Sequence, residues 1–123
     1  TNNALVFENT LALAEMMVVA ERAGVAPSTF MEAISKGSGD SFALRNHGMK
    51  ALLPREFPEK AFPPEYVVKD FSYILDLAEQ TGVNSRVAKL AERYYATAAK
   101  SGWSGRYFPC VIEIIDQDVD LSE

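Results

Sequence analysis

The sequence predicts an all-α fold, a helical bundle wrapped around one long apolar helix at the N-terminus. Three observations lead to this prediction. Apolar residues recur at helical spacings of three and four along most of the chain. Glycines and prolines divide these stretches into pieces of helical length. No stretch of useful length alternates apolar and polar side chains, as a half-buried strand does.

The first stretch, residues 1–23, predicts the central helix. Its charged residues Glu8, Glu15 and Arg22 recur every seven positions and form one narrow stripe, so the helix is apolar on nearly every other side. At about 1.5 Å per residue it would be roughly 30 Å long, the width of a small domain. We therefore expect protein to surround it. Gly24 favours its end, because glycine readily adopts the left-handed conformation just past a helix.

Two shorter helices are expected next. Pro27 suits the first turn of a helix over residues 27–35. Asp40 or Ser41 can then cap a short helix over residues 42–45.

The second half of the chain predicts a helical hairpin and a last helix. Residues 49–64 contain four prolines and are expected to be irregular. Helices are expected over residues 66–81 and, after a cap at Ser85, to about residue 101, because apolar residues there follow an i, i+3, i+4, i+7 pattern. Pro109 begins the last helix.

A short sequence, Ala-Glu-x-x-Gly-Val, occurs at residues 20–25 and again at residues 78–83. Each copy ends one predicted helix and leads into the next. We expect two similar helix ends.

Composition favours a single globular domain over residues 1–123, with 48% hydrophobic and 24% charged residues. The net charge of −5 and the lack of a basic run disfavour a nucleic-acid partner. Cys110, the one cysteine, excludes an internal disulfide, and its apolar neighbours favour a core role over a nucleophile. A reducing, cytoplasmic location fits this.

Other functions are disfavoured by what is missing. Glu8, Glu15 and Glu21 argue against a membrane span in the first helix. His47 has no partners at metal-ligand spacing, so we expect no metal site and place His47 in a loop. A solvated acidic end is expected at Glu113, Asp116, Asp118, Asp120 and Glu123.

Three sets of residues are candidates for chemistry, each with a structural alternative. Asn2 and Asn3 either cap the first helix or hold a substrate oxygen. Lys69 lies near the start of a predicted helix, where a cation opposes the helix dipole, which suggests an anionic ligand or a cofactor. The loop at residues 37–41 either links two helices or binds a carboxylate or phosphate through backbone N–H groups.

Taken in order, these pieces resemble the C-terminal domain of the β-hydroxyacid dehydrogenases. The ordered set is Asn-Asn opening a long apolar helix, Ala-Glu and Gly-Val, Gly-x-Gly-x-Ser, Val-Lys-Asp-Phe, and the second Ala-Glu-x-x-Gly-Val. The family includes 3-hydroxyisobutyrate dehydrogenase and the glyoxylate and succinic semialdehyde reductases, with 6-phosphogluconate dehydrogenase a more distant relative. The resemblance covers nearly the whole chain.

The resemblance implies a substrate-binding and dimerisation domain of an NAD- or NADP-dependent oxidoreductase. The intact enzyme would interconvert a small β-hydroxyacid and its semialdehyde or keto form. An N-terminal dinucleotide-binding domain would precede this chain, and helical domains of this kind would pack into a homodimer or tetramer.

The resemblance also assigns residues. Asn3, with Asn2 beside it, matches the asparagine that holds the substrate, and Lys69 matches the lysine of a Lys-Asp-Leu motif near the nicotinamide, which here reads Lys-Asp-Phe. Lys69 is thus the candidate catalytic and cofactor-binding residue. Gly39 and Ser41 are expected to shape the substrate end of the cleft. The main catalytic lysine, in the pattern Lys-x-x-Asn-Asn, falls before Thr1.

We therefore expect this chain alone to be a fragment that lacks dehydrogenase activity and binds NAD(P) poorly or not at all. The alternative is a non-enzymatic all-α protein-interaction module. A glycine-rich nucleotide-binding unit and a lysine encoded upstream would favour the enzyme, and a start codon there would favour the module. The sequence does not choose between NAD and NADP or identify the hydroxyacid substrate.

Overall fold

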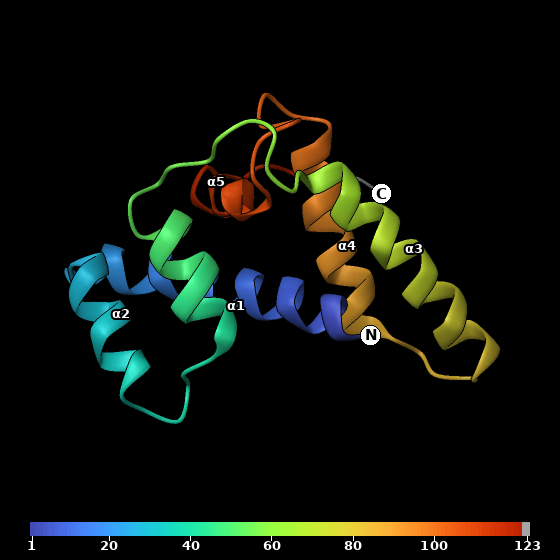
Figure 1. Cartoon of the computed structure of the whole chain (residues 1–123), viewed down its shortest axis with the longest axis horizontal. Coiled ribbons are helices and arrows are strands. Elements are labelled where there is room, and N and C mark those ends of the chain that lie inside the picture. Colours follow the sequence, from blue (N-terminus) through green and yellow to red (C-terminus); the bar gives the residue numbers. More distant parts are fainter. Residues whose placement is uncertain (122–123) are drawn as a thin grey trace.

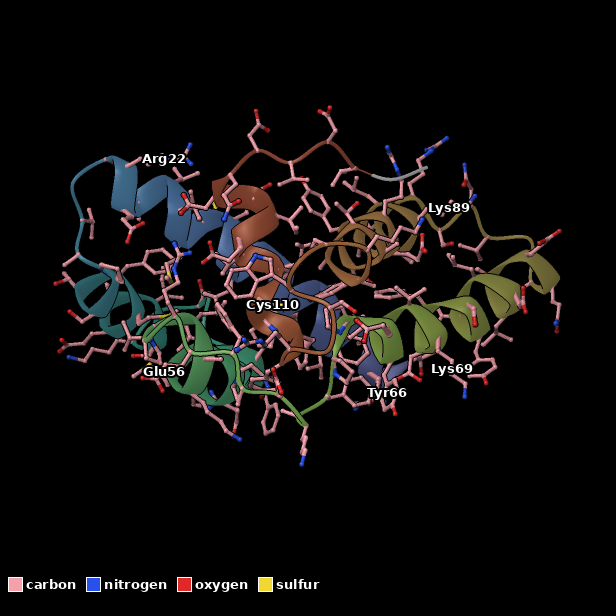
Figure 2. All side chains as sticks on the ribbon, turned by 90° about the horizontal axis from the view of Figure 1, so that it is seen from above. Arg22, Glu56, Tyr66, Lys69, Lys89 and Cys110 are labelled. Carbon is pink, nitrogen blue, oxygen red and sulfur yellow. The ribbon has the colours of Figure 1, made fainter. Side chains whose placement is uncertain are left out.

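The computed structural model describes residues 1–121, and its helices are arranged around α1, which spans Asn2–Arg22. α1 crosses the middle of the molecule, with α2 (Pro27–Ser35) at one end and the paired helices α3 (Pro64–Gln80) and α4 (Arg86–Ala99) at the other (Figure 1). The view from above shows the same pairing of α3 and α4 (Figure 2).

Three further elements complete the fold. They are the π-helix η1 (Leu44–Leu52), the 3-10 helix η2 (Phe108–Cys110) and α5 (Val111–Asp116). α1 contacts each of the other helices. Residues 1–121 contain no strand, only an isolated bridge between Glu59 and Arg106. The predicted all-α bundle around a long N-terminal helix is confirmed.

The two copies of Ala-Glu-x-x-Gly-Val end α1 and α3 in the same way. Their glycines, Gly24 and Gly82, have positive φ angles of 97° and 78°. The amide of the valine after each glycine donates to the carbonyl of the alanine that opens the motif, at 2.9 Å in both copies. These bonds define a Schellman motif, which satisfies carbonyls that a helix end leaves free. The predicted similarity of the two helix ends is confirmed.

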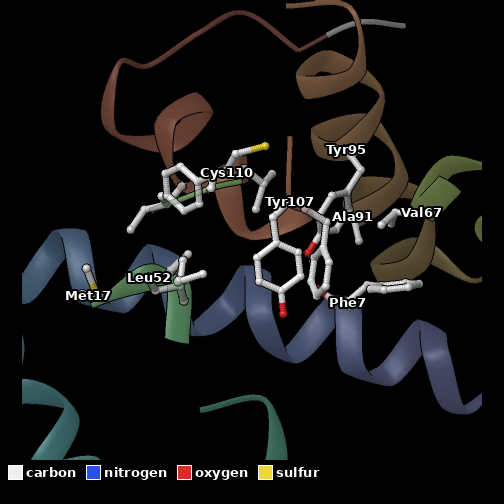
Figure 3. Packing of buried hydrophobic residues seen from close by; sticks show 14 of the residues in the cluster. Phe7, Met17, Leu52, Val67, Ala91, Tyr95, Tyr107 and Cys110 are labelled. Carbon is white, nitrogen blue, oxygen red and sulfur yellow. The ribbon is translucent and has the colours of Figure 1, made fainter. Parts of the chain in front are cut away.

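Phe7 of α1 lies at the centre of an aromatic core. Its ring centroid is 5.1–6.1 Å from those of Phe62, Phe71, Tyr95 and Phe108. The fully buried Tyr95 hydroxyl donates a hydrogen bond to the Phe7 carbonyl at 2.6 Å (Figure 3). These partners come from the segment before α3, from α3, from α4 and from η2, so one side chain of α1 joins four parts of the chain.

The largest difference from the predicted elements is η1. Residues 49–52 were expected to be irregular, and His47 was expected in a loop, but both lie in this π-helix. The expectation rested on the prolines of residues 49–64, but the first of them, Pro54, comes after the end of η1 at Leu52. Gly48 allows η1 to pack closely on α1, since a Cβ there would lie only 3.0 Å from the side chain of Leu13.

The predicted cap of this helical segment is confirmed at its start. The Ser41 hydroxyl accepts a hydrogen bond from the backbone N–H of Leu44 at 3.0 Å. At the end of η1 the N–H of Leu53 donates to the carbonyl of Gly48 at 2.8 Å, five residues back, as in a π-helix.

The sequence suggested that protein surrounds α1 on every side, and the structure shows that it does not. Leu5, Met16 and Val19 are 60%, 47% and 56% exposed, and their helical spacing places them along one open apolar face. By length and composition alone α1 is also apolar enough to cross a membrane, with 33% of its apolar window buried. Its contacts with all the other helices are those of a core helix.

The acidic C-terminal segment is only partly solvated. Asp118 and Asp120 are exposed, as expected. Glu113 and Asp116 are half-buried and form ion pairs, so the prediction was wrong for these two. Glu123 lies outside the described residues.

Arg55 connects this segment to α1. Its guanidinium lies 2.6 Å from Glu113, 3.3 Å from Asp116 and 3.5 Å from Glu21 of α1. Arg22 adds an ion pair to Asp116 at 2.9 Å. The hydrogen bond from Arg22, together with the nearby Arg55, lowers the pKa of Asp116. These ion pairs fix α5 against the C-terminal half of α1.

Replacing Arg55 with alanine should lower the free energy of unfolding by about 1–2 kcal/mol, because Glu113 loses a charge-assisted hydrogen bond in a half-buried place. The control is Lys36→Ala, because the side chains of Lys36 and its partner Glu32 are 73% and 69% exposed, and its loss should cost about 0–1 kcal/mol. Urea denaturation measures both. Equal losses would contradict a special role for Arg55.

Candidate functional site

The structure brings together two candidate motifs that are 67 residues apart. The amide nitrogen of Asn3 donates to the carboxylate of Asp70 at 3.4 Å, and the amide nitrogen of Asn2 donates to the side-chain oxygen of Asn3 at 3.5 Å. Neither asparagine caps α1, whose N-cap residue is Thr1. The capping interpretation was therefore wrong, and both amides face the exposed end of α1.

Lys69 precedes Asp70 on α3 and lies in the second turn of that helix, because α3 begins at Pro64. The dipole argument made from the sequence placed the helix start later and is wrong, since the dipole acts mainly in the first turn. The side chain is exposed and lies on the outer side of α3 (Figure 2). Within residues 1–121 its ammonium forms no ion pair.

A cavity of about 470 Å³ opens beside the two asparagines. Most of its lining is apolar and comes from Val6, Phe7, Phe42, Ala61, Phe62 and Phe108. The polar side chains of the lining are those of Asn2, Asn3, His47, Lys50 and Tyr107. A mostly apolar hollow with a few convergent polar groups is the usual form of a small-molecule site.

Two irregular segments form one wall of the cavity. The backbone N–H of Tyr107 donates to the carbonyl of Pro58 at 2.9 Å, and the N–H of Phe108 donates to the carbonyl of Phe62 at 2.8 Å. These bonds hold the segment before α3 against the segment before α5. They place Phe62 and Tyr107 in the same wall.

Lys50 supplies the positive charge of the cavity. Its ammonium lies 5.5 Å from the centroid of the Tyr107 ring, within cation–π range. His47 forms a hydrogen bond through Nδ1 with the Tyr107 hydroxyl. Burial, and to a smaller extent the charge of Lys50, lowers the pKa of His47, while burial raises the pKa of Tyr107. His47 is therefore mainly uncharged at neutral pH, and the tautomer of its imidazole decides whether Nδ1 accepts from the Tyr107 hydroxyl or donates to it.

Gly39 and Ser41 do not line this cavity. They line a second hollow of about 540 Å³, together with Asn9 and Met16 of α1 and Phe30 of α2. The two hollows are neighbours, because the residue after Ser41 lines the first one. The structure therefore separates the predicted Gly39–Ser41 site from Asn3.

The described part of the chain gives little support for a metal site or a cysteine nucleophile. Residues 1–121 hold no cluster of three or more His, Cys, Asp or Glu side chains suited to a metal ion. Cys110 is fully buried, and burial raises its pKa to about 12, so the thiolate nucleophile is not formed at neutral pH. The predicted core role of Cys110 is confirmed.

Sequence reasoning missed His47 and Lys50. A signal was present, because Leu44, Gly48 and Ala51 follow a helical spacing that would have placed both residues in a helix and on one side of it. Tyr107 gave no such signal, since it lies 60 residues from His47 and meets it only in the fold.

Residues 1–114 match the family described as NAD-binding of NADP-dependent 3-hydroxyisobutyrate dehydrogenase. The chain belongs to this family. The match confirms the resemblance to β-hydroxyacid dehydrogenases at the level of the family, and the family implies NAD(P) in the intact enzyme.

Two curated relatives carry related names. A glyoxylate/succinic semialdehyde reductase 2 from Arabidopsis thaliana is 28% identical over 85% of this chain and 28% of its own length. A 2-(hydroxymethyl)glutarate dehydrogenase from Eubacterium barkeri is 26% identical over 98% of this chain and 40% of its own length. The chain thus spans less than half the length of the curated relatives it matches.

Two solved structures share the fold of this 3-hydroxyisobutyrate dehydrogenase family member. A 3-hydroxyisobutyrate dehydrogenase from Salmonella typhimurium superposes with a TM-score of 0.84 at 22% identity, over 92% of this chain and 39% of that protein. The Mycobacterium tuberculosis 3-hydroxyisobutyrate dehydrogenase with L-serine gives a TM-score of 0.82 at 22% identity, over 93% of this chain and 40% of that protein.

The pKa of His47 should lie below 6.5 and should rise in Lys50→Met, without reaching 6.5, because burial is the larger cause of the shift and persists. NMR titration of the 123-residue chain, which has one histidine, measures it. The control Lys89→Met, on α4, should leave it unchanged. A pKa insensitive to Lys50 would contradict the assigned electrostatics.

The sign of the linked stability effect follows. Since the folded-state pKa of His47 lies below the unfolded value of 6.5, protonation favours the unfolded chain. The contribution of His47 to stability is therefore lost as the pH falls from 6.5 through the folded-state pKa.

Proposed function

We propose that this chain is the C-terminal substrate-binding and dimerisation domain of an NAD(P)-dependent β-hydroxyacid dehydrogenase. The observation that carries the proposal is the contact of Asn3 with Asp70 beside the cavity, because it unites the two motifs that the resemblance assigns to substrate and cofactor. The relatives are named for hydroxyacid dehydrogenation or semialdehyde reduction, which agrees with this reaction class. The intact enzyme interconverts a small β-hydroxyacid and its semialdehyde or keto form.

Asn3 is the residue proposed to hold a substrate oxygen. A primary amide has two N–H donors, and the hydrogen bond to Asp70 uses one of them. The bond from Asn2 occupies the amide oxygen, so the amide is held from both ends. The remaining N–H is free to donate to a hydroxyl or carboxylate oxygen.

NAD or NADP accepts the hydride when it is bound. The exposed ammonium of Lys69, which has no ion-pair partner within residues 1–121, fits a contact with the polar groups of such a cofactor. The same residues contain no strand, and thus none of the glycine-rich turn between strand and helix that holds a dinucleotide. We infer that another domain of the intact enzyme supplies those contacts and the lysine that takes the hydroxyl proton.

It follows that the separate chain lacks dehydrogenase activity. The family description names NAD binding. Our prediction for the separate chain is nevertheless that it binds NAD(P) poorly or not at all. Gly39 and Ser41 keep only a role in the neighbouring hollow, where they would shape the far end of the substrate cleft.

The open apolar face of α1 supports the dimerisation role. Leu5, Met16 and Val19 expose large side chains along one face of α1, whose opposite face, with Phe7 and Ala14, is buried in the core. Large apolar side chains exposed on one face of a helix are typical of interaction sites. A two-fold contact between copies of this domain would cover it. A non-enzymatic interaction module would share this feature but would leave the contact between Asn3 and Asp70 without a role.

In the full-length gene product, Lys69→Ala should lower kcat/KM by about tenfold to a hundredfold, the loss of one charged contact in the transition state. NAD(P)-linked oxidation of a panel of β-hydroxyacids measures it, with Lys89→Ala as an exposed lysine control. Unchanged activity of the Lys69 variant would leave the family intact but overturn the role of Lys69. No turnover of any panel member by wild type would overturn the proposed function.

The full-length gene product should sediment as a dimer or larger assembly, and Leu5→Glu should shift it toward the monomer. The reason is that a carboxylate in an apolar contact loses its hydration. Tyr73→Glu is a matched control, because Tyr73 on α3 is 61% exposed and Leu5 is 60% exposed. Analytical ultracentrifugation measures the mass. Equal behaviour of the two variants would contradict a contact through α1.

A further inference from the structure

We propose that Lys50 recognises the carboxylate of the substrate, so that the cavity selects small hydroxycarboxylates over neutral hydroxy compounds. The inference rests on the proposed function and names a specificity-determining residue for it. It starts from the position of Lys50 on η1, where this lysine lines the same cavity as Asn2 and Asn3 of α1. No feature of the sequence singled this lysine out.

The charges of the cavity lining point to an anion. The lining contains one lysine and no aspartate or glutamate. Within residues 1–121 the ammonium of Lys50 forms no ion pair, so no internal carboxylate competes for it. A carboxylate entering a mostly apolar hollow needs a cation to replace its hydration. Lys50 is the side chain that provides it.

Tyr107 and His47 prepare Lys50 for this contact. The ammonium lies 5.5 Å from the Tyr107 ring centroid, an attraction that favours a position over the ring. The Tyr107 hydroxyl is itself bound by Nδ1 of His47. In the tautomer that carries its proton on Nε2, the neutral imidazole accepts the phenolic hydrogen bond at Nδ1 and offers an N–H donor to a carboxylate oxygen.

The lining also offers two kinds of contact from two different helices. Asn3 on α1 offers an amide donor, and Lys50 on η1 offers a cation. A β-hydroxyacid has a hydroxyl and a carboxylate at its two ends, with a short carbon chain between them. The aromatic side chains of Phe42, Phe62 and Phe108 line the space that this chain and an apolar substituent would fill.

The test compares an acid with its neutral amide on the full-length gene product. Isothermal titration with 3-hydroxyisobutyrate and with 3-hydroxyisobutyramide measures the preference for a charged end without requiring turnover. Wild type should bind the acid about tenfold or more tightly than the amide, as expected for one charge-assisted hydrogen bond. Lys50→Met keeps the stem over Tyr107 and should lose that preference, through weaker binding of the acid alone.

Two controls make the result specific. Lys50→Arg retains the charge and should keep most of the preference. Lys89→Met removes a lysine from α4 and should behave as wild type. Acid binding that does not depend on Lys50, an equal loss for acid and amide, or no preference in wild type would each overturn the inference.

The inference and the proposed function fail in different ways. Acid binding that depends on Lys50, with no NAD(P)-linked oxidation of any β-hydroxyacid, would overturn the proposed function while supporting carboxylate recognition. Turnover with an acid preference that survives Lys50→Met would support the function and overturn the role of Lys50.

Discussion

The burial of Phe7 is the constraint on which the rest of this structure depends. Its ring meets aromatic side chains from the segment before α3, from α3, from α4 and from η2, and its carbonyl accepts the buried hydroxyl of Tyr95. Aromatic pairs at these distances add to the burial of apolar area. Because Phe7 follows Asn3 by about one helical turn, its packing also decides where the two asparagines lie.

The candidate site is built on the same side chains. Phe7, Phe62 and Phe108 belong to the aromatic core and also line the cavity. One side of the cavity is therefore part of the packed core. The polar groups that line the cavity come from α1, from η1 and from the residue before η2. A site supported by a close-packed core holds its geometry better than one formed by loops alone. This explains how a mostly apolar hollow can hold a few donors in place.

The two faces of α1 have different environments. One face forms the core, and another, with Leu5, Met16 and Val19, stays open in this chain. A helix can therefore be apolar on nearly every side although this chain alone does not bury all of those sides. The chain spans 28% to 40% of the length of its relatives, so more protein is available in an intact enzyme of this family to cover the open face.

The sequence by itself determined the features that depend on neighbours along the chain. Helical spacing located α1, α2, α3 and α4, and the repeated Ala-Glu-x-x-Gly-Val predicted two helix ends that the glycines at positive φ confirm. The ordered motifs also led to the family that residues 1–114 match. These are local signals, because a cap, a turn or a helical face is set within a few residues.

Only the tertiary structure decided the rest. Gly48 lets the π-helix η1 approach Leu13 of α1 closely, a contact that no spacing along the chain reveals. The pairs Asn3 with Asp70, His47 with Tyr107, and Arg55 with Glu113 each join residues at least 58 positions apart. Contacts across such separations follow from how helices pack and not from local propensity. The cavity and its lysine therefore became visible only when the chain was folded.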